Sequence, residues 1–126
     1  MTKQNAQQFA ETWVNDWNRR DVEAVLSHFD DEVVFISPKA QQIVGRAEMR
    51  GKAELRNYWQ TALAQIQELN FKLDRVIVDG DAVAIVYWSR LNGKTTHAIE
   101  SFTMNQSGLA VRGEAFYGTI TSAQVE

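Results

Sequence analysis

The chain has 126 residues, which is the usual length of one domain, and its 44% hydrophobic and 23% charged residues exclude a disordered chain. A net charge of −3 and the lack of a dense basic stripe argue against a nucleic-acid partner. Cysteine is absent, which excludes disulfides, thiolate nucleophiles and cysteine-bound zinc. The longest apolar run, Ala82 to Trp88, is far shorter than the ~20 residues of a membrane helix. The polar N-terminal segment has no apolar stretch of the kind found in a secretory signal. We therefore expect a cytoplasmic protein with no membrane contact.

The first helix is predicted by bulky rings at intervals of four residues. Phe9, Trp13 and Trp17 form the apolar stripe of an amphipathic helix. Asp21 then provides an N-cap for a shorter helix over residues 22–29. The sequence therefore predicts two consecutive helices at the start of the chain.

A strand and a third helix are predicted next. Residues 33–36 are β-branched or aromatic, which indicates a strand that Pro38 closes. Residues 42–44 are ambiguous and allow a short strand before Gly45. Residues 51–67 return to helical spacing, with leucine and aromatic side chains on one face.

The second half of the chain is typical of antiparallel strands. Asn92-Gly93 is a strong hairpin signal, because a type I′ turn requires positive φ at both positions. The predicted strands cover residues 69–79, 82–91, 95–105 and 110–121. Three helices interleaved with one strand, followed by a meander, indicate an α+β fold with the helices on one face of a bent sheet.

The strand over residues 82–91 has an unusual pattern. Ala82 to Trp88 contains no polar alternation, which indicates that both faces of this strand are covered. Helices can cover one face. We expect a second subunit on the other, which makes the protein a homodimer through the sheet; the alternative is that the helices wrap around the sheet edge.

Several segments resemble the nuclear-transport-factor-2-like superfamily. Residues 13–25 are similar to its first two helices, residues 29–35 to the junction with its first strand, and Gly45-Arg46 with residues 50–56 to its glycine-led third helix. Gly108 followed by residues 114–117 resembles its last hairpin. The closest subset is the SnoaL-like branch, which includes polyketide cyclases and ketosteroid isomerases.

This resemblance implies a single SnoaL-like domain over residues 1–126. Its expected form is a cone-shaped α+β barrel of a curved antiparallel sheet, with about three helices on the concave face. The resemblance also implies an apolar cavity, open at one end, and a dimer formed through the sheet. No cofactor is expected.

The resemblance implies three positions for acid–base chemistry. Ketosteroid isomerases use a tyrosine on the first helix, a carboxylic acid on a meander strand and a basic carboxylate just before a proline. Trp13, Glu100 and Ser37 stand at these positions. Serine cannot accept a proton from carbon near neutral pH and indole does not titrate, so the isomerase mechanism is not supported as it stands.

Glu100 is therefore the one catalytic candidate. If it faces an apolar cavity, desolvation raises its pKa and suits it to general acid or base work. The alternative is an ion pair with Arg90 or Arg112 across the sheet. His97 lies three residues earlier, so on a strand it faces the other way, and capping or solvation accounts for His28. We accordingly expect no metal site.

The aromatic residues are expected to point between the helices and the sheet. The predicted ligand-binding residues are Trp13, Trp17, Phe35, Ser37, Tyr58, Trp59, Phe102 and Tyr117. The alternative is that these rings only fill the interior. The sequence thus predicts a protein that binds a small, mostly apolar organic molecule, with isomerase, cyclase or dehydratase chemistry at Glu100. A non-catalytic ligand-binding or protein-interaction module is the competing hypothesis.

Overall fold

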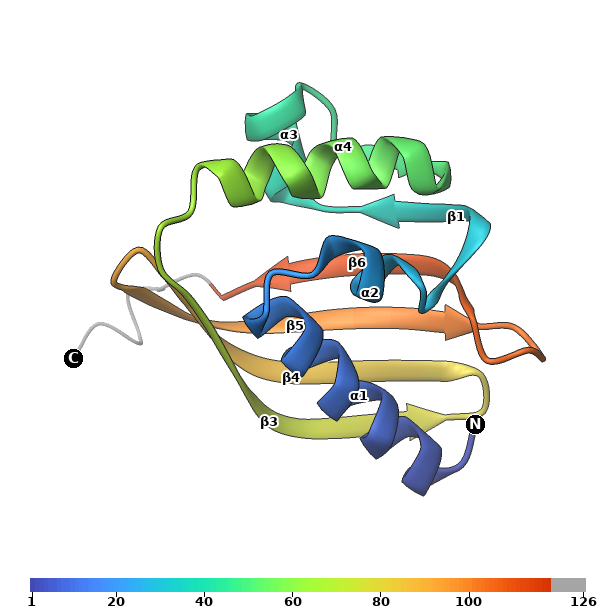
Figure 1. The fold of residues 1–126 in the computed structure, drawn as a ribbon. Helices are drawn as coiled ribbons and strands as arrows, with labels where there is room; N and C mark the ends of the chain where they lie inside the picture. The colour runs from blue at the N-terminus through green and yellow to red at the C-terminus, as the bar shows by residue number, and fades with distance from the viewer. Residues whose placement is uncertain (119–126) are drawn as a thin grey trace.

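A computed structural model describes residues 1–118, which form four helices and one six-stranded sheet (Figure 1). The helices are α1 (Lys3–Asn18), α2 (Val22–Leu26), α3 (Pro38–Val44) and α4 (Gly51–Ala64). The strands are β1 (Phe29–Ile36), β2 (Glu48–Arg50), β3 (Leu69–Asp79), β4 (Ala82–Leu91), β5 (Lys94–Met104) and β6 (Ala110–Tyr117). The predicted α+β class is confirmed. No helix in residues 1–118 is both long enough and apolar enough to cross a membrane.

The sheet has the strand order β2-β1-β6-β5-β4-β3. Strands β3 to β6 form the predicted antiparallel meander. The pairing of β1 with β6 is parallel, so the expectation of an antiparallel sheet fails at this one junction. Within the described residues, β2 and β3 are the two edges of a curved sheet that stays open rather than closing into a barrel.

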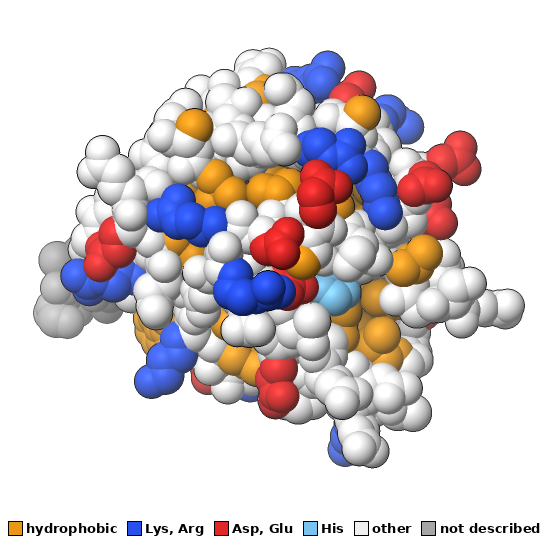
Figure 2. Space-filling model, in the orientation of Figure 1, with side chains coloured by type: hydrophobic (Ala, Val, Ile, Leu, Met, Phe, Trp, Pro, Cys, Tyr) orange, Lys and Arg blue, Asp and Glu red, His pale blue; other side chains and the backbone are white. Residues whose placement is uncertain are grey.

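The helices lie on one face of the sheet (Figure 1), and in the same orientation the surface of this side carries acidic and basic side chains interspersed (Figure 2). Helix α1 packs against β3 and α4 packs against β1. A pair of hydrogen bonds fixes the end of α1: the Asn18 side chain donates to the Phe71 carbonyl at 2.9 Å and accepts from its N–H at 2.7 Å. The large buried side chains of α1 and α4 belong to the same hydrophobic core as those of the strands.

The predictions for the first half hold in outline, but β1 begins at Phe29 rather than residue 33, α4 ends at Ala64 rather than residue 67, and β2 was not predicted. The Ala24 N–H donates to the Asp21 side chain at 3.0 Å, which confirms the predicted N-cap of α2. This helix ends at Leu26 rather than Phe29, because Phe29 already belongs to β1 and is fully buried. The possible strand at residues 42–44 is wrong. These residues form the end of α3, which begins at Pro38. The sequence predicted three helices, and α3 is the fourth, which it did not predict.

The second half follows its sequence closely. Strands β3 and β4 have the predicted bounds, and β5 is displaced by one residue at each end. The backbone φ is 50° at Asn92 and 83° at Gly93, as the hairpin signal requires. Residues 119–121 of the last predicted strand lie outside the described residues.

The outer face of the sheet carries large apolar side chains that face solvent. Ile77, Trp88, Ile99 and Phe116 are between 37% and 53% exposed. The alternative in which helices cover this face is therefore wrong for residues 1–118. The second subunit expected there stays a prediction.

Candidate functional site

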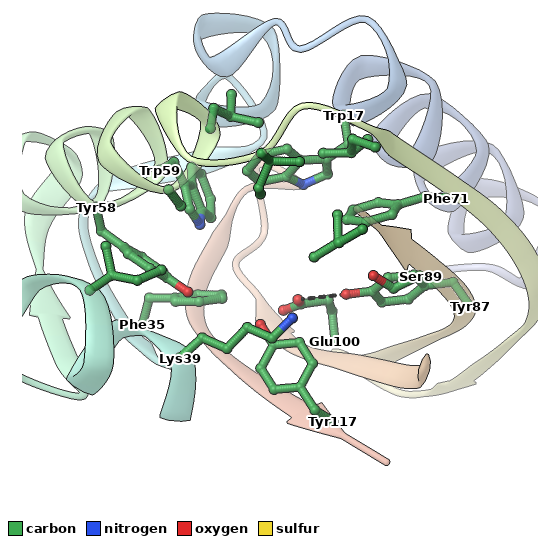
Figure 3. A pocket seen from close by; sticks show the side chains of 16 residues that line it. Trp17, Phe35, Lys39, Tyr58, Trp59, Phe71, Tyr87, Ser89, Glu100 and Tyr117 are labelled. Carbon is green, nitrogen blue, oxygen red and sulfur yellow. Dashed lines mark hydrogen bonds between the residues drawn. The ribbon is translucent and has the colours of Figure 1, made fainter. Parts of the chain in front are cut away.

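A cavity of about 80 Å³ lies between the helices and the inner face of the sheet (Figure 3). Its buried wall includes Trp17, Phe35, Tyr58, Trp59, Tyr87 and Glu100. Its half-buried rim includes Lys39, Ile43, Leu63, Ile66, Leu91 and Tyr117. This volume exceeds the ~10–15 Å³ that one water needs, and it is below the ~300–1,000 Å³ of a typical ligand pocket. The cavity therefore suits a small molecule, or one ring of a larger molecule that extends through the rim.

Glu100 is the buried acid of this cavity. Strand β5 turns it inward, and its side chain is only 5% exposed. The Tyr87 hydroxyl donates to Oε1 at 3.1 Å, while Oε2 has no partner among the described residues. Burial raises the pKa of Glu100 from 4.5 to about 8, against smaller opposing effects of the Tyr87 hydrogen bond and the Lys39 charge. The carboxyl is therefore largely protonated at neutral pH.

The arginine pairing considered as an alternative is wrong for Glu100. Arg90 binds Glu68 at 3.3 Å on the surface, and neither Arg90 nor Arg112 forms an ion pair with Glu100. Glu100 is thus hydrogen-bonded to the neutral Tyr87 phenol and not to an arginine, and the positive charge that acts on it is that of Lys39.

Ser37 supports two tyrosines at the cavity. Its Oγ lies 3.0 Å from the Tyr58 hydroxyl and 3.4 Å from the Tyr117 hydroxyl. Burial raises the pKa of both phenols, so they act as neutral hydrogen-bonding groups. Ser37 itself is fully buried and has no described histidine or carboxylate hydrogen-bonded to it, which leaves it a positioning role.

Lys39 is a site residue that the sequence interpretation missed. It is the second residue of α3, and its Nζ lies 4.2 Å from the centre of the Tyr117 ring. Figure 3 shows the amine directed into the cavity toward Glu100. Burial lowers the pKa of Lys39, and the charge of Glu100 partly opposes this. In the sequence, Lys39 stands directly after Pro38 in a segment with no clear helical or strand periodicity. That position alone did not indicate that its side chain enters the cavity.

Six of the nine predicted site residues line the cavity. They are Trp17, Phe35, Tyr58, Trp59, Glu100 and Tyr117. Ser37 reaches the cavity only through its two tyrosines. Trp13 and Phe102 belong to the adjoining core. The cavity also contains Tyr87 and Phe71, which the prediction omitted.

Trp13 lies behind the cavity wall. Its ring is 5.2 Å from that of Tyr87 and 5.9 Å from that of Phe71, between centroids, and both of those rings do line the cavity. Phe102 packs edge-to-face on Phe9 and Phe29. Trp13 and Phe102 therefore support the cavity from outside rather than forming its surface.

The histidines lie elsewhere. His97 is on the outer face of the sheet, stacked on Trp88 and bonded to Asp74 at 2.9 Å, so the prediction that it faces away from Glu100 is confirmed. His28 bonds the buried Asp16 at 2.9 Å, so capping or solvation is not its role. Residues 1–118 contain no group of three or more side chains placed to hold a metal ion.

The SnoaL-like domain family matches residues 10–113. A SnoaL-like protein of unknown function from Burkholderia thailandensis is 35% identical over 94% of this chain and 99% of its own, with a TM-score of 0.85. An NTF2-like protein of unknown function from Burkholderia pseudomallei is 21% identical over 94% of this chain and 92% of its own, with a TM-score of 0.79.

A third solved structure is TerC, co-crystallised with polyporic acid. It is 18% identical over 90% of this chain and 92% of its own, with a TM-score of 0.77. None of the curated proteins compared with the chain matches it. The family match covers most of the chain and agrees with the fold and the inner cavity. The chain therefore belongs to the SnoaL-like domain family, and NTF2-like proteins are among its structural neighbours.

Proposed function

We propose that this protein binds a small, mostly apolar organic molecule in the aromatic cavity and that Glu100 acts on the polar group of that molecule as a general acid and base. The observation that carries the proposal is the Oε2 atom of Glu100, buried at an apolar cavity without a described partner. A buried polar atom of this kind costs free energy unless a ligand or water satisfies it.

The protonation of Glu100 also supports acid–base chemistry. A group with a pKa near the working pH exchanges its proton most effectively, and the pKa of Glu100 is about 8. Isomerases, cyclases and dehydratases all move protons at or next to a carbonyl or hydroxyl group. TerC, a protein of the same fold, was co-crystallised with polyporic acid, which supports an organic ligand for this chain.

The competing function is binding without catalysis. Both functions use the same aromatic wall, and they differ in the fate of the ligand. A ligand retained through purification and recovered unchanged would favour a binding or sensing protein. Native mass spectrometry followed by chemical identification of the released molecule distinguishes the two.

The catalytic part is tested by Glu100→Gln, which keeps the shape of the side chain and removes its proton chemistry. We expect turnover of a compound found in a panel of steroid-like, polyketide-like and terpenoid molecules to fall by about 10²–10⁴-fold. Glu32→Gln is the matched control, because Glu32 is exposed and forms no side-chain bond in residues 1–118. Unchanged turnover in the Glu100 variant would remove Glu100 from the mechanism.

We also propose that a second copy of the chain covers the outer face of the sheet. Trp88, Ile99 and Phe116 are exposed on adjacent strands, with Ile99 directly opposite Phe116 in the register. Exposed apolar side chains grouped in this way mark interaction surfaces, and a two-fold dimer presents the same face twice.

The double variant Trp88→Lys, Phe116→Lys tests this dimer. It is expected to be monomeric in sedimentation experiments in which the wild type is dimeric. A wild type that stays monomeric at every concentration would contradict this.

A further inference from the structure

We propose that the ligand carries one ionised oxygen on its apolar body, as in a carboxylate, enolate or phenolate, and that Lys39 binds this oxygen while Glu100 donates a hydrogen bond to it. This inference rests on the function proposed above and specifies the chemical class of the ligand. It assigns Lys39 as the residue that selects for negative charge.

One basic and one acidic side chain line the cavity, and they form no ion pair with each other. Lys39 and Glu100 are the two lining side chains that carry a charge in their usual ionised forms. Lys39 forms no ion pair with any residue in 1–118; its close neighbour is the Tyr117 ring, at 4.2 Å from Nζ. Glu100 is mostly neutral at pH 7 because its pKa is about 8. Lys39 therefore faces the cavity without a described anionic partner, and a ligand with an ionised oxygen would provide one.

The unpartnered polar atoms of the wall point to the same ligand. Because the Tyr87 hydroxyl occupies Oε1 of Glu100, the acidic proton can reside on Oε2, which has no described partner. The Nε1 atom of Trp17 is also buried without a described partner, and indole only donates. Lys39 likewise has three donors and no acceptor. The cavity offers donors from α1, α3 and β5, so its ligand supplies acceptor atoms.

The groups that face Glu100 set the pH range of this selectivity. They are Lys39 on α3, Tyr58 on α4, Tyr87 on β4 and Tyr117 on β6, while Lys94 acts on Lys39. The three phenols have raised pKa values and stay neutral. When the pH rises through about 8, Glu100 becomes a carboxylate and competes with the ligand for Lys39. Anion binding should therefore weaken across this range.

The test compares benzoate with benzamide, which has nearly the same size and shape but no charge. In calorimetric titrations at about pH 6, we expect the wild type to bind benzoate at least about tenfold more tightly, as a charge-assisted hydrogen bond implies. Lys39→Met should abolish the preference and Lys39→Arg should retain it. Lys72→Met, which removes an exposed lysine of β3, should behave as the wild type.

A pH series adds a second measurement. Between about pH 6 and pH 9, benzoate affinity should fall further in the wild type than in Glu100→Gln, since only the wild type gains a carboxylate in the cavity. Glu100→Gln should still prefer benzoate at the lower pH, because its amide is neutral and donates.

The outcomes separate this inference from the proposed function. Two results would overturn the role of Lys39: benzamide that binds as tightly as benzoate, or a preference for benzoate that persists in Lys39→Met. In both cases the cavity would still bind a small aromatic molecule, and the proposed function would stand. Binding of neither probe below about 10 mM would overturn both proposals, because a cavity closed to a single ring cannot take the ligands described above.

Discussion

We expect Glu100→Gln to be more stable than the wild type at about pH 9 and to have nearly the same stability at about pH 5. The pKa of Glu100 is 4.5 in its ordinary environment and about 8 in the folded chain. Between these values the folded state holds a proton that the unfolded state has released, so wild-type stability falls as the pH rises through this window and levels off above it. The full effect is on the order of 5 kcal/mol, since each pKa unit corresponds to about 1.4 kcal/mol.

The effect is measured as the difference in free energy of unfolding between the two proteins, from urea titrations at several pH values. This difference cancels the surface groups, which titrate alike in both chains, and it includes the effect of the Glu100 charge on Lys39. Glu32→Gln should follow the wild type at each pH, since its side chain is exposed. Parallel curves for the wild type and Glu100→Gln between about pH 5 and pH 9 would show that Glu100 is not held neutral in the folded chain.

The local elements of this fold could be predicted because their signals are local. The spacing of Phe9, Trp13 and Trp17 depends only on the period of a helix, and Asn92-Gly93 depends only on its own backbone angles. The parallel pairing of β1 with β6 joins residues such as Val34 and Arg112, far apart in sequence. No local pattern carries that information, and the general expectation of an antiparallel sheet therefore failed there.

The site residues show the same limit. Trp13 and Trp17 are one helical turn apart on the same face of α1, so periodicity predicts that both point inward. It does not tell how far along the sheet each one lies. Trp17 reaches the cavity, whereas Trp13 lies behind Tyr87 and Phe71. Tyr87 was missed because it stands in an unbroken apolar run, where its hydroxyl gave no sign that it binds Glu100.

Trp13→Ala should lower the free energy of unfolding by about 3–5 kcal/mol, the usual cost of removing a buried aromatic side chain. Trp13 is 2% exposed and contacts the rings of Trp17, Phe71, Tyr87 and Phe102. Trp13→Phe should cost less, because it keeps one ring and removes an indole N–H that is buried without a described partner. Urea titration of both variants measures these costs.

Ligand binding then separates the two neighbouring tryptophans. Trp13→Phe should keep the benzoate affinity within a few-fold, because Trp13 lies outside the cavity lining, whereas Trp17→Phe should weaken it by removing a donor from the wall. Far-UV circular dichroism should be unchanged in both variants, so that a loss of affinity reports on the site. A tenfold or greater loss in a folded Trp13→Phe protein would mean that this indole contacts the ligand directly, as the position it shares with the isomerase tyrosine implies. The cavity would then extend past Tyr87 toward α1 when it is occupied.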